Sequence, residues 1–365
     1  MIRKLTPQEY LFISYAKALG IIAVIIGHYP WYPVKIYNPY IFHMPLFFLL
    51  GGVLAQPIID WKKWIGKIVK SYIAYTVIWY LVLAICAVCI NKLFGTQIIM
   101  VLSSTDKFDY AIYPLTQNMH NNRLFLVAWF FVAYILSISL FRLILTLLEH
   151  LTIPHFRIIS FLLGMVVGYF SIGYISPLYH REKFWLYNLL CQVGTGFMMI
   201  SIGFGIRNYL AIFKNIKLLL ISIIIMVVFV GNGTFHPLIM AFSDYPDGFY
   251  IHTISSLSGC FGLLSISYFL SLSGKNRLLQ TVGNSTKDIM TLHILAFVIA
   301  DLILSYFGYY DRGKINGTAH YVNPSAWPLY IGLGLFFPLF IGNIVRPYFN
   351  IKVNAIKMRF QAINT

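Results

Sequence analysis

Long apolar stretches separated by short polar breaks run along almost the whole chain. A stretch of about 20 apolar residues is long enough for a helix to cross the hydrocarbon core of a bilayer. About ten such stretches can be distinguished, with turn or charge signals between them, as at 29–33 and 273–277. Their approximate bounds are 11–29, 39–56, 71–90, 124–146, 157–176, 186–206, 216–232, 249–272, 286–306 and 327–345. The pattern predicts an all-α fold, a polytopic membrane helix bundle of about ten transmembrane helices.

Composition agrees with a membrane protein. Hydrophobic residues make up 59% of the chain and charged residues 10%, whereas a soluble domain carries about 25% charge. The net charge of +16 would suit a nucleic-acid partner, but its distribution indicates topology instead. With the N-terminus inside, about two thirds of the 27 lysines and arginines fall on the cytoplasmic side, as the positive-inside rule requires. We therefore expect both termini in the cytoplasm and no nucleic-acid partner.

The apolar stretches occupy nearly the whole length, so we expect one transmembrane domain over residues 1–365. It would end in a short cytoplasmic tail, 346–365, with no appended soluble domain. Cys86 and Cys89 have the C-x-x-C spacing, but they fall inside a predicted span, where packing is the ordinary role of a thiol. No metal site is expected.

Lys17 and His28 stand out in the first apolar stretch. Eleven residues separate them, and eleven steps of about 100° return to within about 20° of the start, so both project from one helix face. The helix rise places them about 16 Å apart, about half a bilayer. Such groups are costly in a membrane unless they line a polar cavity. The alternative is a lysine that reaches the inner surface and a histidine that faces headgroups.

Two further features follow along the chain. The run 42–52 contains His43 followed by a proline and paired glycines, residues that bend a membrane helix and let another backbone approach. His43 is either a hydrogen-bonded packing residue or a cavity residue. Lys67 and Lys70 are three residues apart in a basic cytoplasmic run, hence neighbours on a helix face. They would either hold phosphate groups or contact anionic lipid.

The last candidates lie in later stretches. Trp129 would be either an interfacial aromatic residue or part of a site. His293 lies near the start of the ninth stretch, and Asp301, eight residues later, is rotated by about 80° from it. Asp301 is the acidic residue deepest in a predicted span. An intramembrane carboxylate is a functional candidate by default, although it can equally satisfy a neighbouring helix.

Taken in this order, these features resemble the acyltransferase-3 family of integral-membrane O-acyltransferases. The resemblance covers essentially the whole chain. The sequence around His43 is similar to that of the branch that includes fucose 4-O-acetylase-like and surface-polysaccharide O-acetyltransferases. The family has Arg in place of Lys67 and Lys70, so here the charge is kept while bidentate phosphate binding is lost. The matching residues are Lys17 and His28, the Pro-Leu-Phe-Phe run at 45–48 with Gly51 and Gly52, Lys67 and Lys70, Trp129 and Phe130, and Leu292 and His293.

The resemblance implies transfer of an acetyl group from cytoplasmic acetyl-CoA to a sugar hydroxyl of a surface polysaccharide or lipid-linked glycan. The protein would lie among membrane lipids, in a bacterial cytoplasmic (inner) membrane. His28 would be the general base or a transient acyl carrier, and Lys17 would position the donor. Lys67 and Lys70 would bind the donor phosphates. The residues left for the acceptor are His43, Trp129, His293 and Asp301.

A transporter or flippase for a polar or lipid-linked solute is the alternative from another class. Many spans, intramembrane ionisable residues and glycine-rich helices are compatible with transport. No inverted repeat between the two halves is evident in the sequence, however. Consumption of an acyl-CoA would distinguish the enzyme from the transporter. The acyl group itself is open, because the sequence also allows succinyl transfer.

Overall fold

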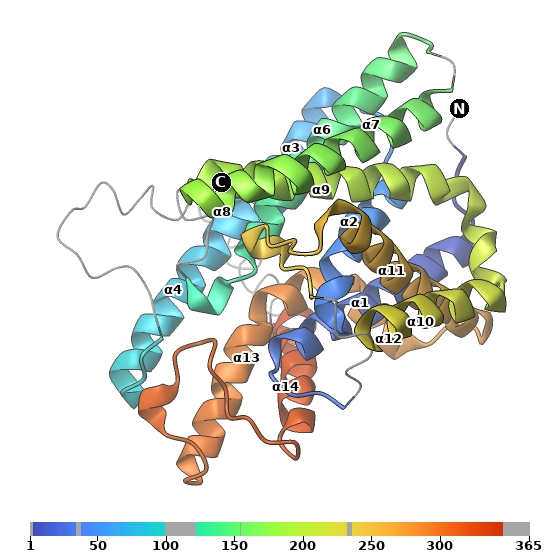
Figure 1. Ribbon diagram of the computed structural model, residues 1–365. Helices are drawn as coiled ribbons and strands as arrows, with labels where there is room; N and C mark the ends of the chain where they lie inside the picture. Colours follow the sequence, from blue (N-terminus) through green and yellow to red (C-terminus); the bar gives the residue numbers. More distant parts are fainter. Residues whose placement is uncertain (1–2, 34–37, 99–121, 154, 232–235, 346–365) are drawn as a thin grey trace, which may run out of the picture.

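The computed structural model describes residues 3–33, 38–98, 122–153, 155–231 and 236–345 (Figure 1). Within these ranges the chain is built from helices and loops, without a β-strand; a single isolated bridge joins Ile239 and Asp244. The predicted all-α class is therefore confirmed. The predicted tail 346–365 lies outside the described residues.

Seven helical segments of the described chain are long and apolar enough to cross a membrane, and three other apolar helices are shorter. Each predicted stretch overlaps one of these helical segments. The number of transmembrane helices stays a prediction, because the three short helices fall below the usual spanning length. The long segments are α1 (Pro7–His28), α3, η2 and α4 (Trp61–Ile68, Val69–Ile73, Ala74–Phe94), α6 (Ala128–His150), α7, η4 and α8 (Phe156–Phe170, Ser171–Ile175, Ser176–Glu182), α9 and η5 (Trp185–Ile206, Arg207–Lys214), α11 (Gly248–Leu272) and α13 (Thr286–Tyr306). The shorter ones are α2 (His43–Leu54), α10 (Ile216–Gly231) and α14 (Trp327–Phe340), which continues into η8 (Ile341–Val345).

Short elements fill the connections. They are η1 (Pro39–Ile41), η3 (Arg123–Phe125), η6 (Met240–Phe242), α12 (Arg277–Asn284) and η7 (Arg312–Lys314).

A capping box fixes the start of α1. The Thr6 hydroxyl accepts a hydrogen bond from the Glu9 backbone N–H (3.2 Å), and the Glu9 carboxylate accepts one from the Thr6 N–H (2.8 Å). Two backbone donors that the helix itself cannot satisfy are thereby paired. Pro7 then occupies the first helical position, where its missing N–H costs nothing.

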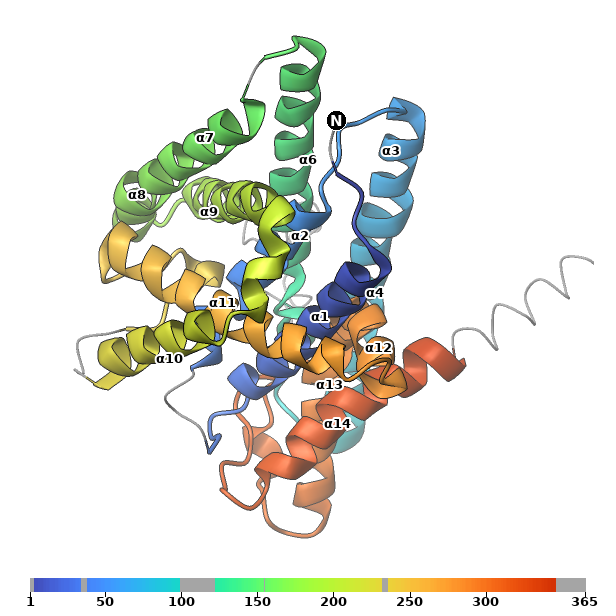
Figure 2. The same ribbon diagram turned by 90° about the vertical axis from the view of Figure 1, so that its right-hand side faces the viewer.

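The second predicted stretch, 39–56, is shorter in the structure. Pro39 to Ile41 form the separate 3-10 turn η1, which the Asn38 side chain caps by accepting from the Tyr40 N–H (3.0 Å), and α2 begins only at His43. Almost every residue of α2 is buried. Figure 2 shows α9 beside it, viewed nearly end-on. This short helix is thus the centre of the bundle rather than a lipid-facing span.

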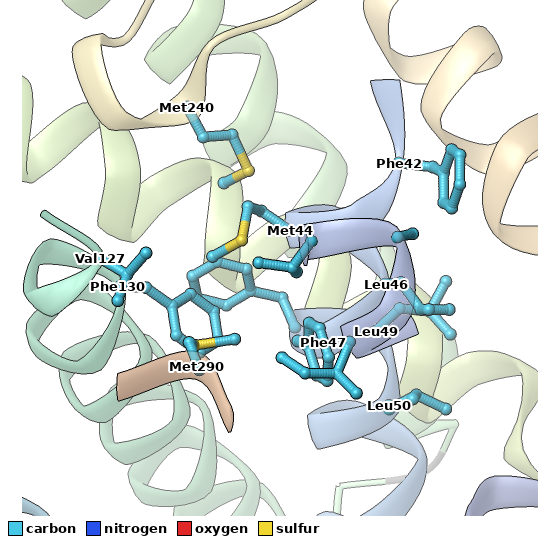
Figure 3. Packing of buried hydrophobic residues seen from close by; sticks show 14 of the residues in the cluster. Phe42, Met44, Leu46, Phe47, Leu49, Leu50, Val127, Phe130, Met240 and Met290 are labelled. Atoms are coloured by element: carbon cyan, nitrogen blue, oxygen red, sulfur yellow. The ribbon is translucent and has the colours of Figure 1, made fainter. Parts of the chain in front are cut away.

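Glycines bring α2 and α9 into backbone contact. A Cβ added at Gly52 would overlap the backbone of Ile200, and one added at Gly203 would overlap the backbone of Leu49. Helices in membranes approach closely only where such small residues lie at the interface. The contact holds α2 in a fixed register, which positions His43. Figure 3 shows apolar side chains of α2, among them Met44 and Phe47, packed beside Phe130.

Candidate functional site

Two of the cavities along α1 contain an ionisable residue of this helix, one at its C-terminal end and the other near its middle. We call them the His28 cavity and the Lys17 cavity after the ionisable residue that α1 contributes to each. Their volumes are about 70 Å³ and about 240 Å³, smaller than an ordinary small-ligand site of about 300–1,000 Å³. The His28 cavity is lined by His28, Tyr40, His43, Met44, Leu126, Val127, Trp129 and the 238–242 segment. The Lys17 cavity is lined by Lys17, Phe47, Leu50, Gly51, Leu54, Tyr72, Phe130, Phe131, Tyr134, Thr286, Lys287 and Met290.

His28 is the last residue of α1, and its imidazole faces the first cavity. The ring centre of His293, from α13, lies 4.9 Å away, and that of Tyr40 lies 6.2 Å away. Among the described residues the His28 ring makes no hydrogen bond, so its nitrogens are available to a ligand. The structure therefore brings His28 and His293, far apart in the sequence, into direct contact.

Backbone hydrogen bonds determine the tautomers of the two neighbouring histidines. Nδ1 of His293 lies 3.0 Å from the Ile289 carbonyl oxygen, and Nδ1 of His43 lies 2.5 Å from that of Pro39. A carbonyl can only accept, so in each neutral ring Nδ1 carries the proton and Nε2 keeps a lone pair. Nε2 of His293 is buried without a partner among the described residues. An unpartnered buried acceptor costs free energy, which makes His293 a candidate for binding or chemistry.

The Lys17 cavity holds two cations. Lys17 makes no ion pair with a carboxylate of the described chain. Lys287, near the start of α13, donates to the Ser71 carbonyl and lies 3.6 Å from the ring centre of Tyr75. Lysines beside aromatic rings at a cavity wall suit an anionic ligand, since each contributes a positive charge at reduced solvation.

Lys67 and Lys70 do not line either cavity. Both side chains are exposed, the first at the end of α3 and the second in the π-helical turn η2. A π turn rotates the residues that follow it relative to a regular helix. The predicted shared face of these two lysines therefore lies at a local change of helical register, outside the Lys17 cavity.

Asp301 does not line the His28 cavity; it lies in a polar network that Phe297 joins to His293, since the Phe297 ring contacts both His320 and His293. Its carboxylate accepts from Nδ1 of His320 (2.7 Å), from the hydroxyl of Tyr330 (2.5 Å) and from the backbone N–H of Tyr321 (3.1 Å). The side chain is completely buried. These contacts join α13 to α14 and to the loop before it. Asp301 was a candidate either for function or for satisfying a neighbouring helix, and its contacts are of the second kind. His293, rotated by about 80° on the same helix, contacts His28.

Hydrogen bonds between Asp247 and His236 brace the loop that carries the 238–242 wall of the His28 cavity. The Asp247 carboxylate accepts from the ring Nδ1 of His236 (2.9 Å) and from the His236 backbone N–H (2.8 Å). Burial raises the pKa of Asp247, but these hydrogen bonds and the nearby His252 outweigh burial and hold that pKa below its ordinary value. The charged carboxylate thus ties together both ends of the loop that carries the 238–242 segment.

Sequence reasoning missed three parts of this arrangement. Lys287 looked like an ordinary lysine at the inner end of a span, and Tyr40 like part of the second span. The 238–242 segment carries no motif at all. The only signal for Lys287 was its place in the polar run just before His293, where two charges open an otherwise apolar stretch.

One protein-family model, described as an acyltransferase domain, matches the chain over residues 10–343. That range contains both cavities and the Asp301 network. No curated protein and no solved structure matches the chain.

Proposed function

The chain belongs to the acyltransferase-3 family and is an integral-membrane acyltransferase, and from this premise we propose that it moves an acetyl group from cytoplasmic acetyl-CoA to a sugar hydroxyl. The acceptor is a surface polysaccharide or a lipid-linked glycan, as in the fucose 4-O-acetylase-like branch. One observation carries the proposal: a single helix presents a cation to one cavity and an imidazole to another, about 16 Å apart by helix rise.

The donor enters at the Lys17 cavity. The charge distribution of the sequence predicts that the N-terminal end of α1, on the Lys17 side of His28, faces the cytoplasm, where acetyl-CoA is made. Lys17 and Lys287 attract the donor's phosphates into the cavity, and Lys67 and Lys70, on the exposed side of the same inner region, add to the positive field. The acyl end of the donor then points along α1 toward His28.

The acceptor hydroxyl is activated by His28. As general base, its imidazole takes the hydroxyl proton while the hydroxyl oxygen bonds to the acyl carbon. The bond between that carbon and the CoA sulfur breaks, and the proton passes from the imidazolium to the departing thiolate. A variant of the same chemistry has His28 carry the acyl group briefly before the acceptor attacks. In either case no metal ion takes part.

His293, His43 and Trp129 serve the acceptor side. The unpartnered Nε2 of His293 lies on a ring beside that of His28, and in the reacting complex it would accept a hydrogen bond from His28 and orient that ring, as the carboxylate does in a hydrolase triad. His43 offers a second acceptor for a sugar hydroxyl, and Trp129 a flat apolar wall with one N–H donor. Asp301 holds the loop around His320 in place. We place the enzyme in the cytoplasmic membrane of a bacterium, as one transmembrane domain.

Calorimetric titration of acetyl-CoA into the purified protein in nanodiscs tests the donor side. Lys17→Met and Lys287→Met keep the side-chain length but remove the charge, and each is expected to weaken binding about 10- to 100-fold, the range of a charge-assisted hydrogen bond. Lys67→Ala/Lys70→Ala is also expected to weaken it. Lys63→Met is the matched control, because Lys63 is 88% exposed and paired with Asp60.

Dephospho-CoA distinguishes a phosphate-dependent site from a site for the rest of the donor, and it is expected to bind more weakly. Unchanged affinity in the Lys67/Lys70 variant would reassign that pair to lipid contact. If the folded wild-type protein fails to bind acetyl-CoA at millimolar concentration, the acyltransferase proposal fails in its donor, and solute transport becomes the better account.

A further inference from the structure

The His28 and Lys17 cavities are separated by a single layer of side chains. On α2, Met44 lines the first cavity and Phe47 the second, three residues later. On α6, the neighbours Trp129 and Phe130 line one cavity each. Three residues correspond to about 5 Å along a helix axis, which leaves room for one side chain and no more.

The third wall of this partition comes from α13. Met290 lines the Lys17 cavity, and His293, one turn further on, contacts His28. We call Met44, Phe47, Phe130 and Met290 the apolar layer. Figure 3 shows these four side chains gathered around one point between α2, α6 and α13.

Phe130 is the centre of the apolar layer. Its ring centre lies 6.1 Å from that of Phe47, 5.2 Å from that of Phe48 and 5.5 Å from that of Tyr134. The ring is 6% exposed and packed edge-on between its neighbours, an arrangement that aromatic rings prefer. The two methionines of the layer are unbranched and adapt their shape easily. The layer thus combines one rigid obstacle with flexible edges.

A group that passes from Lys17 to His28 between α2, α6 and α13 crosses this layer. The acyl end of a thioester is small, and its carbonyl is its one polar group, so it loses little solvation by entering an apolar constriction. The phosphates and water lose far more, because no polar group of the layer would receive them. A longer acyl chain needs space that the Phe130 ring occupies.

We propose that the apolar layer is an acyl-size filter, in which Phe130 admits a short acyl group to His28 and rejects longer ones. This rests on the proposed function, since it assumes that a donor thioester enters from the Lys17 cavity. It goes beyond that function by assigning the choice of acyl group to one ring, at a position outside the groups that react.

The test compares donors that differ only in chain length. Acetyl-CoA and hexanoyl-CoA are titrated calorimetrically into wild type, Phe130→Ala and Phe141→Ala in nanodiscs, so no acceptor is needed. Phe141 is the matched control: it is a fully buried phenylalanine on the same helix, packed on Phe197 and Phe204, and it lines neither cavity. Phe130→Ala is expected to raise the affinity for hexanoyl-CoA relative to acetyl-CoA at least tenfold, and Phe141→Ala to leave the ratio within twofold.

Two milder variants keep the test decisive if Phe130→Ala does not fold. Phe130→Leu and Met44→Ala remove less volume, from opposite sides of the layer, and both are expected to shift the ratio in the same direction. An unchanged ratio in folded variants that still bind acetyl-CoA would overturn the filter and leave the proposed function standing. Failure of the wild type to bind either donor would instead overturn the proposed function, and the filter with it.

Discussion

Helical geometry selects the protonated nitrogen of two histidines in this protein. In both His43 and His293, Nδ1 donates to the carbonyl four residues earlier, so Nε2 keeps its lone pair. A hydrogen bond of this kind orients the ring as well as fixing its tautomer. The sequence gives the positions of the histidines, but the bonded nitrogen depends on a side-chain rotamer that no spacing rule supplies.

Residue spacing predicted how Lys17 and His28 lie relative to each other, but it gave no sign of the role of Lys287. Lys17 and His28 were expected on one face of a helix, and each now lines a cavity along α1. The angle of about 80° between His293 and Asp301 likewise agrees with their separate surroundings. Lys287 was missed because a span-end lysine and a cavity lysine are identical in sequence, and only the tertiary fold distinguishes them.

Asp301→Asn is expected to destabilise the protein rather than to block chemistry. The amide keeps one acceptor but loses the charge, and hydrogen bonds to a buried charged group are worth about 1.5–3 kcal/mol, so the unfolding free energy should fall by about that amount. Thermal unfolding of the purified protein in nanodiscs measures the loss. Asp311→Asn is the control, because Asp311 is an exposed residue that caps η7 through the Gly313 N–H (2.9 Å). Full stability combined with lost acyl transfer would move Asp301 into the active site.

At the scale of elements, hydropathy located the apolar helices but not their neighbours. The segment from Trp61 to Phe94 and the segment from Trp185 to Lys214 both score as spans, yet 22% of the first apolar window is buried inside the protein and 72% of the second. Lipid and protein interior are equally apolar, so hydropathy does not separate them. The central role of α2 therefore became visible only in the fold. Its shortened start follows from Pro39, which opens a separate turn.

Gly52→Ala is expected to lower the stability of the bundle. The added methyl group would overlap the Ile200 backbone, which cannot move aside as a side chain can, and overpacking of this kind costs about 1–3 kcal/mol. Gly66→Ala makes the same chemical change in α3, where a Cβ meets nothing within 4 Å. There the exchange should stabilise the helix by about 0.5–1 kcal/mol. Thermal unfolding in nanodiscs compares the two, and equal midpoints would contradict the close packing of α2 on α9.

At the scale of the whole molecule, four helices far apart in the sequence meet around the apolar layer. α1 supplies Lys17 and His28, and α2, α6 and α13 supply the partition between their cavities. Membership of the family and the all-α class followed from the sequence pattern. The two cavities did not, because an apolar pattern says nothing about which helices adjoin. In the proposed function, a charged donor stays in one cavity while its acyl end reaches the other.

The most direct measurement is acetyl transfer in inside-out membrane vesicles that contain the protein. Radiolabelled acetyl-CoA is supplied at the exposed cytoplasmic face, and alkali-labile label is counted in the glycan fraction, for wild type, His28→Ala and His180→Ala. His180 is the control because it lines neither cavity; its Nε2 lies 3.1 Å from the Ser243 carbonyl oxygen and 4.0 Å from an Asp244 carboxylate oxygen. Loss of a general base costs about 10²- to 10⁴-fold in rate. The account predicts that loss for His28→Ala and wild-type transfer for His180→Ala; substantial transfer by an equally abundant, folded His28→Ala protein would contradict it.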